Sequence, residues 1–150
     1  VRARAREMKR QHGIHVLMVD YLQLIRGVRY SDRVQEVGEV AMGLKQLAGE
    51  LDIPVLAGCS MNRVLDRESP GSRPKLNHLR DSGDIEAHAD TVMALYRQAR
   101  TQDEVDREDR DCVVKTGLDI MKQRAGRLGV VNMVLQRRHV RFEQSSRVET

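Results

Sequence analysis

The sequence has almost no aromatic side chains. Its 150 residues include no Trp, one Phe and three Tyr. The core must therefore be built from aliphatic side chains and Met, and any nucleic-acid contact is expected to be mainly ionic because little surface is available for stacking bases. The two cysteines, Cys59 and Cys112, lie far apart without metal-type spacing. This is typical of a reduced, cytoplasmic protein rather than a disulfide scaffold.

Several longer patterns are also missing, and each absence excludes a class of protein. No apolar run approaches the roughly 18 residues that span a bilayer, so we expect no membrane partner. The first ten residues, "VRARAREMKR", lack the apolar core of a signal peptide. No G-x-x-x-x-G-K-S/T loop, dinucleotide fingerprint or G-x-S-x-G elbow occurs. The sequence therefore contains no phosphate-cradling loop of its own.

Charge is abundant and has a basic excess. Charged residues make up 32% of the chain, and the net charge is +4. This balance favours an anionic partner, although a solvated basic surface gives the same totals. A chain of this length most simply forms one domain.

The spacing of apolar residues predicts an α/β protein. A helix ending at Gly13, a strand at His15–Ile25, a helix at Ser31–Leu51 and a strand at Ile53–Cys59 follow one another. This β-α-β order predicts a parallel sheet covered by helices. The remaining expected elements are a short helix around 85–90, a strand at 91–97, a solvated loop at 98–111, and strands within 112–124, 128–136 and 139–142 that end the sheet in antiparallel pairs.

One acid stands where such sheets bind ligands. Asp20 lies within the apolar run "HVLMVDYLQLI" and is predicted at the carboxyl end of a buried strand. Nucleotide-binding sheets use an acid here to hold Mg²⁺, directly or through water. Alternatively, Asp20 is a polar residue that only ends a strand.

Basic residues form two further candidate sites. Arg80 stands beside a glycine in "LRDSGD", where a guanidinium and backbone N–H groups can meet a phosphate. "MKQRAGR" brings Lys122, Arg124 and Arg127 to one strand end, where cations can neutralise phosphoryl charge. A solvated basic strand end is the alternative. His12 and His15 lack a third ligand nearby and do not indicate zinc.

The ordered set of motifs resembles one family. "VDYLQLI", "RVQEVGEVAMGLKQLAGELDIPVLA", "NRVLDRESPGSRPKLNHLRDSGDIEAHADTVMALYR" and "MKQRAGRLGVV" are similar, in order, to the second half of the motor domain of DnaB-type replicative helicases. The resemblance runs from Val1 to Phe142, with Arg100–Asp111 outside it. It implies a RecA-like three-layer fold, incomplete in its N-terminal half, over residues 1–143, followed by a polar tail at 144–150.

The resemblance also implies an activity and a set of partners. The family forms hexameric rings that hydrolyse ATP with Mg²⁺ between subunits and unwind duplex DNA by moving along single-stranded DNA. Carried onto this chain, Asp20 matches the Walker B acid that serves Mg²⁺. Arg124 matches the finger that reaches a neighbouring subunit's γ-phosphate, with Lys122 beside it on the same strand face. The loop that holds DNA matches Arg80, Asp81 and Gly83.

The sequence departs from the family at three positions. Ser60 stands where the family has a γ-phosphate-sensing Gln, Ala125 replaces an Asn, and Asp81 replaces a Glu. The Walker A loop and the catalytic glutamate of the family lie before the matched region. Glu7 does not match the catalytic glutamate. We therefore expect no ATP hydrolysis by this chain alone. Its expected partners are single-stranded DNA, a second copy or an intact helicase subunit in a ring, and a separate P-loop half. The alternative is a non-catalytic module that binds DNA or associates with a ring.

Overall fold

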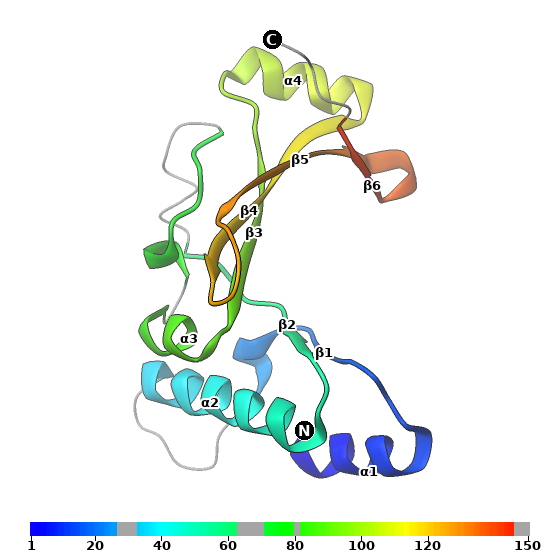
Figure 1. Cartoon of the computed structure of the whole chain (residues 1–150). Coiled ribbons are helices and arrows are strands. Elements are labelled where there is room, and N and C mark those ends of the chain that lie inside the picture. The colour runs from blue at the N-terminus through cyan, green and yellow to red at the C-terminus, as the bar shows by residue number, and fades with distance from the viewer. Residues whose placement is uncertain (27–32, 63–70, 80–81, 146–150) are drawn as a thin grey trace. The chain divides into compact units, whose positions relative to one another are not determined.

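The computed structural model describes residues 1–26, 33–62, 71–79 and 82–145. The chain divides into two compact units. The first is Val1–Asn62 with Leu79–Ala89, and the second is Arg63–His78 with Asp90–Thr150. Each unit has its own sheet, with two parallel strands in the first and four antiparallel strands in the second (Figure 1).

The first unit holds helices around a short parallel sheet. Its elements are α1 (Arg2–His12), β1 (Leu17–Val19), η1 (Leu22–Leu24), α2 (Arg33–Leu51), β2 (Val55–Ala57) and α3 (Ser82–His88). Helix α1 ends at Gly13, which has a φ of 60° and whose N–H donates to the Lys9 carbonyl at 3.0 Å. This confirms the predicted glycine cap.

Helix α2 follows the predicted amphipathic pattern and supplies much of the first unit's core. It buries Val37, Ala41, Leu44 and Leu47, which recur at the 3-and-4 spacing of one helix face. Helices α2 and α3 lie side by side (Figure 1), and Asp84 of α3 occupies the space beside Gly38, so no side chain fits at that position. The prediction of a helix at Ser31–Leu51 is confirmed for Arg33–Leu51.

The strand predicted at His15–Ile25 is too long. Only Leu17–Val19 forms β1, and Leu22–Leu24 forms a 3₁₀ turn. The strand ends early because the Leu22 N–H donates to the Gly58 carbonyl at 2.8 Å, which turns the chain across the end of β2. The apolar pattern could not reveal this, since Leu22 is buried in the turn as it would be in a strand.

The second unit is a four-stranded antiparallel sheet with one helix. Its elements are η3 (Leu76–His78), β3 (Thr91–Arg97), α4 (Gln102–Asp111), β4 (Val113–Gln123), β5 (Gly129–Gln136), η4 (Arg137–His139) and β6 (Arg141–Gln144), with strand order β3-β4-β5-β6. The expectation of a mostly parallel sheet is therefore wrong for the described residues, because β3 pairs antiparallel with β4 instead of continuing the β-α-β order. The antiparallel C-terminal strands are confirmed.

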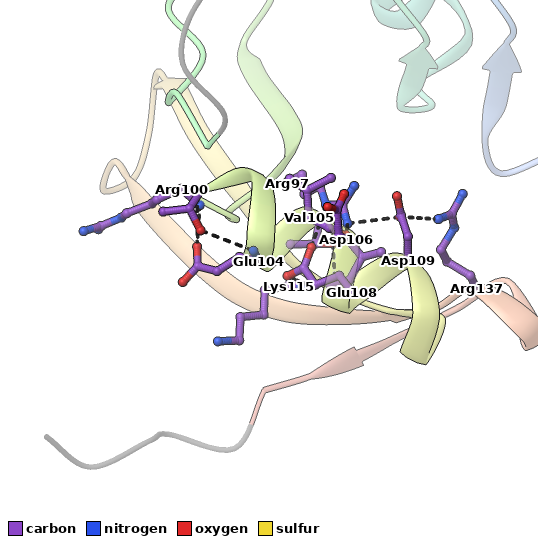
Figure 2. A network of polar contacts seen from close by, with 12 residues as sticks. Arg97, Arg100, Glu104, Val105, Asp106, Glu108, Asp109, Lys115 and Arg137 are labelled. Carbon is purple, nitrogen blue, oxygen red and sulfur yellow. Dashed lines mark hydrogen bonds and ion pairs between the residues drawn. The ribbon is translucent and has the colours of Figure 1, made fainter.

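The segment predicted as a solvated loop contains helix α4. Its start has a complete capping box, in which the Thr101 hydroxyl accepts from the Glu104 N–H at 3.2 Å and the Glu104 carboxylate accepts from the Thr101 N–H. The helix is fixed by ion pairs rather than by an apolar stripe. Figure 2 shows Arg97 of β3 and Arg137 of η4 meeting acids of α4. The T-x-x-E signal of the capping box was present in the sequence.

Candidate functional site

Asp20 directly follows β1 at the edge where the sequence predicts a ligand. Strands β1 and β2 are parallel, so their carboxyl ends share one edge of the sheet. Gly58 follows β2, and its N–H donates to the Val19 carbonyl at 2.8 Å. A Cβ atom at Gly58 would lie 3.4 Å from Asp20 Oδ1. Because Asp20 is exposed, its carboxylate is accessible to a ligand beside a residue that has no side chain.

Gln23 joins the two strand ends, a role that the sequence analysis missed. Its Oε1 accepts from the Ser60 N–H at 3.1 Å, and its Nε2 lies 3.1 Å from Cys59 Sγ. Its carbonyl accepts from Arg33, which also contacts Glu36. The available signal was a single amide within the apolar run "DYLQLI". The segment after Asp20 is thus held both to the end of β2 and to the start of α2.

The chemistry of this edge fits one ligand of a hard cation rather than a complete metal centre. Among the described residues, no group of three or more His, Cys, Asp or Glu side chains could hold a metal ion. Mg²⁺ does not need such a group, because it keeps several waters and is bound through one or two carboxylates plus substrate phosphates. Asp20 fits that mode, directly or through a water.

The basic strand end lies in the second unit, where β4 stops at Gln123 and Arg124 begins the turn to β5. The Arg124 N–H donates to the Asp90 carbonyl at 3.0 Å, and its Nη1 lies 3.3 Å from Asp90 Oδ1. Both side chains are about half exposed. Arg124 is the first residue after β4, so the expectation that it shares a strand face with Lys122 stays a prediction.

A β-bulge determines the face on which Lys122 lies. Val92 pairs with Lys122, but Met93 pairs with Ile120, so Met121 is an extra residue in β4. Bulges of this kind re-aim side chains. Ala94 pairs with Asp119, and Val92 and Ala94 share one face of β3 because side chains alternate along a strand. Lys122 and Asp119 consequently lie on the same face of the sheet.

The predicted DNA loop is only partly within the described residues. Arg80 and Asp81 lie outside them. Gly83 lies in the first turn of α3 and is exposed, and a Cβ atom added to it would meet nothing within 4 Å. Internal packing therefore does not require glycine at position 83. Asp20 and Gly83 belong to the first unit, and Lys122 and Arg124 belong to the second.

The fold that carries these residues resembles half of an ATPase domain. A solved structure described as an ATPase domain matches 97% of this chain and 50% of that chain, with a TM-score of 0.80 and 30% sequence identity. A second solved structure, described as a DnaB-like replicative helicase and its interactions with primase, matches 89% of this chain and 31% of its own, with a TM-score of 0.73 and 32% identity.

The sequence comparisons agree with the structural ones. The family profile described as "DnaB-like helicase C terminal domain" matches residues 1–144, and the chain belongs to this family. The replicative DNA helicase DnaB of Rickettsia bellii (strain RML369-C) is 52% identical over 99 residues, which cover 65% of this chain and 20% of the relative. That of Pasteurella multocida (strain Pm70) is 39% identical over 145 residues, covering 95% of this chain and 30% of the relative. The chain thus spans about a fifth to a third of these relatives. A search of the described helices finds none long and apolar enough to cross a bilayer.

Proposed function

We propose that this chain is the part of a replicative DNA helicase motor that carries the Walker B acid, the DNA loop and the arginine finger. The observation that carries the proposal is the exposed carboxylate of Asp20 beside Gly58, at the shared carboxyl edge of two parallel strands, in a chain of the DnaB-like family. The motor is a cytoplasmic, hexameric ring with a RecA-like three-layer fold. It unwinds duplex DNA as it moves along single-stranded DNA.

In this proposal the nucleotide site has two parts, and this chain supplies only the part that contains Asp20. Mg²⁺, when bound, would neutralise charge on the phosphates of ATP. Asp20 holds that ion directly or through a water. The phosphate-cradling loop and the catalytic base come from polypeptide outside these 150 residues, since no G-x-x-x-x-G-K-S/T occurs in the sequence. The isolated chain therefore does not hydrolyse ATP.

Arg124 is the finger that stabilises phosphoryl charge in a neighbouring subunit's site, and Lys122 supports it. The ion pair with Asp90 does not prevent this role, because both partners are about half exposed and such pairs contribute only about 0–1 kcal/mol. In this proposal Arg80, Asp81 and Gly83 belong to the loop that holds the DNA backbone, where the Arg80 guanidinium meets a phosphate.

The proposal is tested by ATPase activity, with and without single-stranded DNA, of the chain alone and of the chain mixed with a separately expressed P-loop half. Turnover only in the mixture supports it, and Asp20→Asn should then abolish that turnover. A well-folded mixture that assembles but never turns over ATP argues for the non-catalytic module instead.

Arg124→Ala in the active mixture should reduce turnover by at least about a hundredfold, because an arginine finger contributes about 10³–10⁵ to kcat. Nucleotide binding should survive, since the finger acts on a site that other residues form. Arg138→Ala, a loss of the same charge from an exposed residue of η4 in the same unit, is the matched control. Retained turnover in Arg124→Ala would remove this residue from the finger role.

A specific observation keeps the second candidate function open. Met18 of β1 and Leu56 of β2 are register partners, and they are 69% and 49% exposed. An exposed apolar pair on a two-stranded sheet favours association with another polypeptide. A module that only joins a ring through this surface would associate with an intact helicase without changing its ATPase rate.

A further inference from the structure

The turn that contains Arg124 is joined to the residues at the start of β3. Thr91 and Gln123 are register partners, so Asp90 and Arg124 are the next residues on the two chains. The Arg124 N–H donates to the Asp90 carbonyl at 3.0 Å, which carries the antiparallel pairing one residue beyond β4. The side chains also meet, since Arg124 Nη1 lies 3.3 Å from Asp90 Oδ1. Asp90 therefore contacts both the backbone and the guanidinium of the residue proposed as the finger.

Two further contacts fix the backbone of the same turn. Thr91 Oγ1 donates to Gln123 Oε1 at 2.5 Å. A Cβ atom at Gly126 would lie 2.8 Å from Cγ of Gln123, so this side chain packs closely against the turn. Gln123 thus contacts β3 on one side and the turn on the other. Because the backbone is held in this way, the part of Arg124 that is left to be oriented is its long side chain.

A finger residue needs a defined position for its guanidinium. The Arg124 side chain has several rotatable bonds and is about half exposed, so hydration by itself does not select one rotamer. In an active site a misplacement of about 1 Å can cost about a hundredfold in rate. An acid beside the guanidinium restricts the rotamers that it samples before it meets a phosphoryl group. Asp90 is such an acid.

The exposure of the pair suits a guanidinium that must change partners. The side chains are 50% exposed for Arg124 and 53% exposed for Asp90, so both groups stay hydrated. An exposed pair of this kind contributes little to stability. It can therefore bias the orientation of the guanidinium and still release it to a more strongly charged phosphoryl group.

We propose that Asp90 is a positioning residue for Arg124, which orients the guanidinium for a neighbouring subunit's phosphoryl group and releases it there. This inference rests on the proposed function, because it requires Arg124 to be the finger. Asp90 touches no nucleotide in this proposal, and it acts only through Arg124.

Charge removal at Asp90 distinguishes positioning from general electrostatics. If only charge matters, Asp90→Ala makes the region more positive and should increase turnover or affinity for anionic ATP. If Asp90 positions Arg124, kcat should instead fall by about twofold to fivefold, the effect expected of opposite charges at neighbouring positions of a sheet. Asp90→Lys should lower kcat further, because like charges placed opposite each other repel. The matched control is Asp106→Ala, which removes the same charge from an exposed position on α4 in the same unit.

The first measurement is the ATPase rate of the full chain mixed with a saturating amount of the P-loop half, at several ATP concentrations. A finger acts on charge that develops in the transition state, so Asp90→Ala should lower kcat and leave KM for ATP unchanged. A general structural defect would instead raise KM or reduce assembly. The double variant Asp90→Ala/Arg124→Ala should be no slower than Arg124→Ala, because Asp90 acts only through Arg124.

The second measurement needs no P-loop half. Nuclear magnetic relaxation of the Arg124 side-chain Nε, in the isotope-labelled full chain, reports how well the guanidinium is ordered. The order parameter should fall in Asp90→Ala and keep its wild-type value in Asp106→Ala. Equal order in wild type and Asp90→Ala would overturn the inference.

The outcomes distinguish this inference from the proposed function. If the wild-type mixture does not hydrolyse ATP, or Arg124→Ala is as fast as wild type, the finger assignment is wrong and the inference fails with it. If Arg124→Ala is slow while Asp90→Ala and Asp90→Lys are as fast as wild type or faster, only the inference is overturned. A lower kcat and lower order in Asp90→Ala, with an unchanged KM and no effect of Asp106→Ala, support it.

Discussion

Glu108→Ala should release helix α4 from the sheet. The Glu108 side chain is 9% exposed, and its carboxylate accepts from Arg97 Nε at 2.6 Å and from the Lys115 N–H at 3.0 Å. Truncation leaves both donors without this acceptor, as Figure 2 allows the reader to follow. Removing one partner of a buried ion pair costs about 3–5 kcal/mol.

The structure places the cost at the lower end of that range. Arg97 is 29% exposed and keeps two acceptors on α4, the Val105 carbonyl at 2.7 Å and Asp109 Oδ1 at 3.1 Å. Burial lowers the pKa of Arg97, but its hydrogen bonds to Glu108 and Asp109 outweigh this and leave the pKa above its ordinary value. We therefore expect Glu108→Ala to lower the free energy of unfolding of the second unit by about 3 kcal/mol.

The assay is denaturant unfolding followed by circular dichroism, with hydrogen exchange to locate the loss. Because the chain has two units, a single two-state transition is not assumed, and faster exchange at the Lys115 amide and along α4 identifies the affected part. Asp106→Ala is the matched control, since Asp106 is exposed and its side chain contacts Gln102 at 2.9 Å on the same helix. It should change stability by at most about 0.5 kcal/mol. A loss below about 1 kcal/mol in Glu108→Ala, or equal losses in both variants, would refute the reasoning.

Two further predictions concern the edges of the second unit. Gly71→Ala should destabilise the second unit by about 1–3 kcal/mol, because alanine would have to adopt a positive φ there and its Cβ atom would meet the Ala99 carbonyl oxygen. Gly129→Ala is the control in thermal unfolding, and its effect should be much smaller because a Cβ atom at that position meets nothing within 4 Å. The Arg100 N–H donates to the Glu104 carboxylate and lowers the pKa of Glu104, so the stabilisation of α4 is present above the ordinary glutamate pKa and is lost as pH falls through the lowered value. Exchange of α4 amides measured from about pH 5 to about pH 2 should show this loss, and an unchanged profile in Glu104→Gln would contradict it.

The sequence predicted local elements well where one face of the element is apolar. The helix expected at Ser31–Leu51 is found at Arg33–Leu51, because Val37, Ala41 and Leu44 recur at helical spacing and are buried. Helix α4 was missed because an ion pair between Arg97 and Glu108 holds it to the sheet. A search for periodic apolar residues does not detect a helix that is held by polar contacts. Its capping box was the remaining local signal.

Contacts between distant residues could not be predicted in the same way. The position of Asp20 at a strand end followed from the local pattern, but its neighbour Gly58 depends on the pairing of β1 with β2. The ion pair between Arg73 and Asp119 joins residues 46 positions apart. The bulge that aims Lys122 is a property of the β3–β4 register. Residue types therefore identified candidate functional residues. Only the fold determined which of these residues lie next to one another.

The two-stranded sheet gives a final prediction about the edge that carries Asp20. A sheet of two three-residue strands is marginal by itself, and among the described residues β1 pairs with β2 alone. Because Met18 and Leu56 expose one of its faces, a polypeptide that pairs with or covers this sheet would stabilise it by binding the folded form. In the chain alone, the amides of β1 should exchange with solvent far faster than those in the centre of β4.

Mixing with a P-loop half should slow exchange at β1 and leave β4 unchanged. Met18→Lys, which places a charge in the exposed apolar pair, should weaken that protection, whereas Leu128→Lys, at a similarly exposed position in the second unit, should not. If β1 is already as protected as β4 in the chain alone, the sheet does not need another polypeptide. In that case the sheet edge that carries Asp20 is complete without one, and the proposed nucleotide site would need only a phosphate loop and a base from another polypeptide.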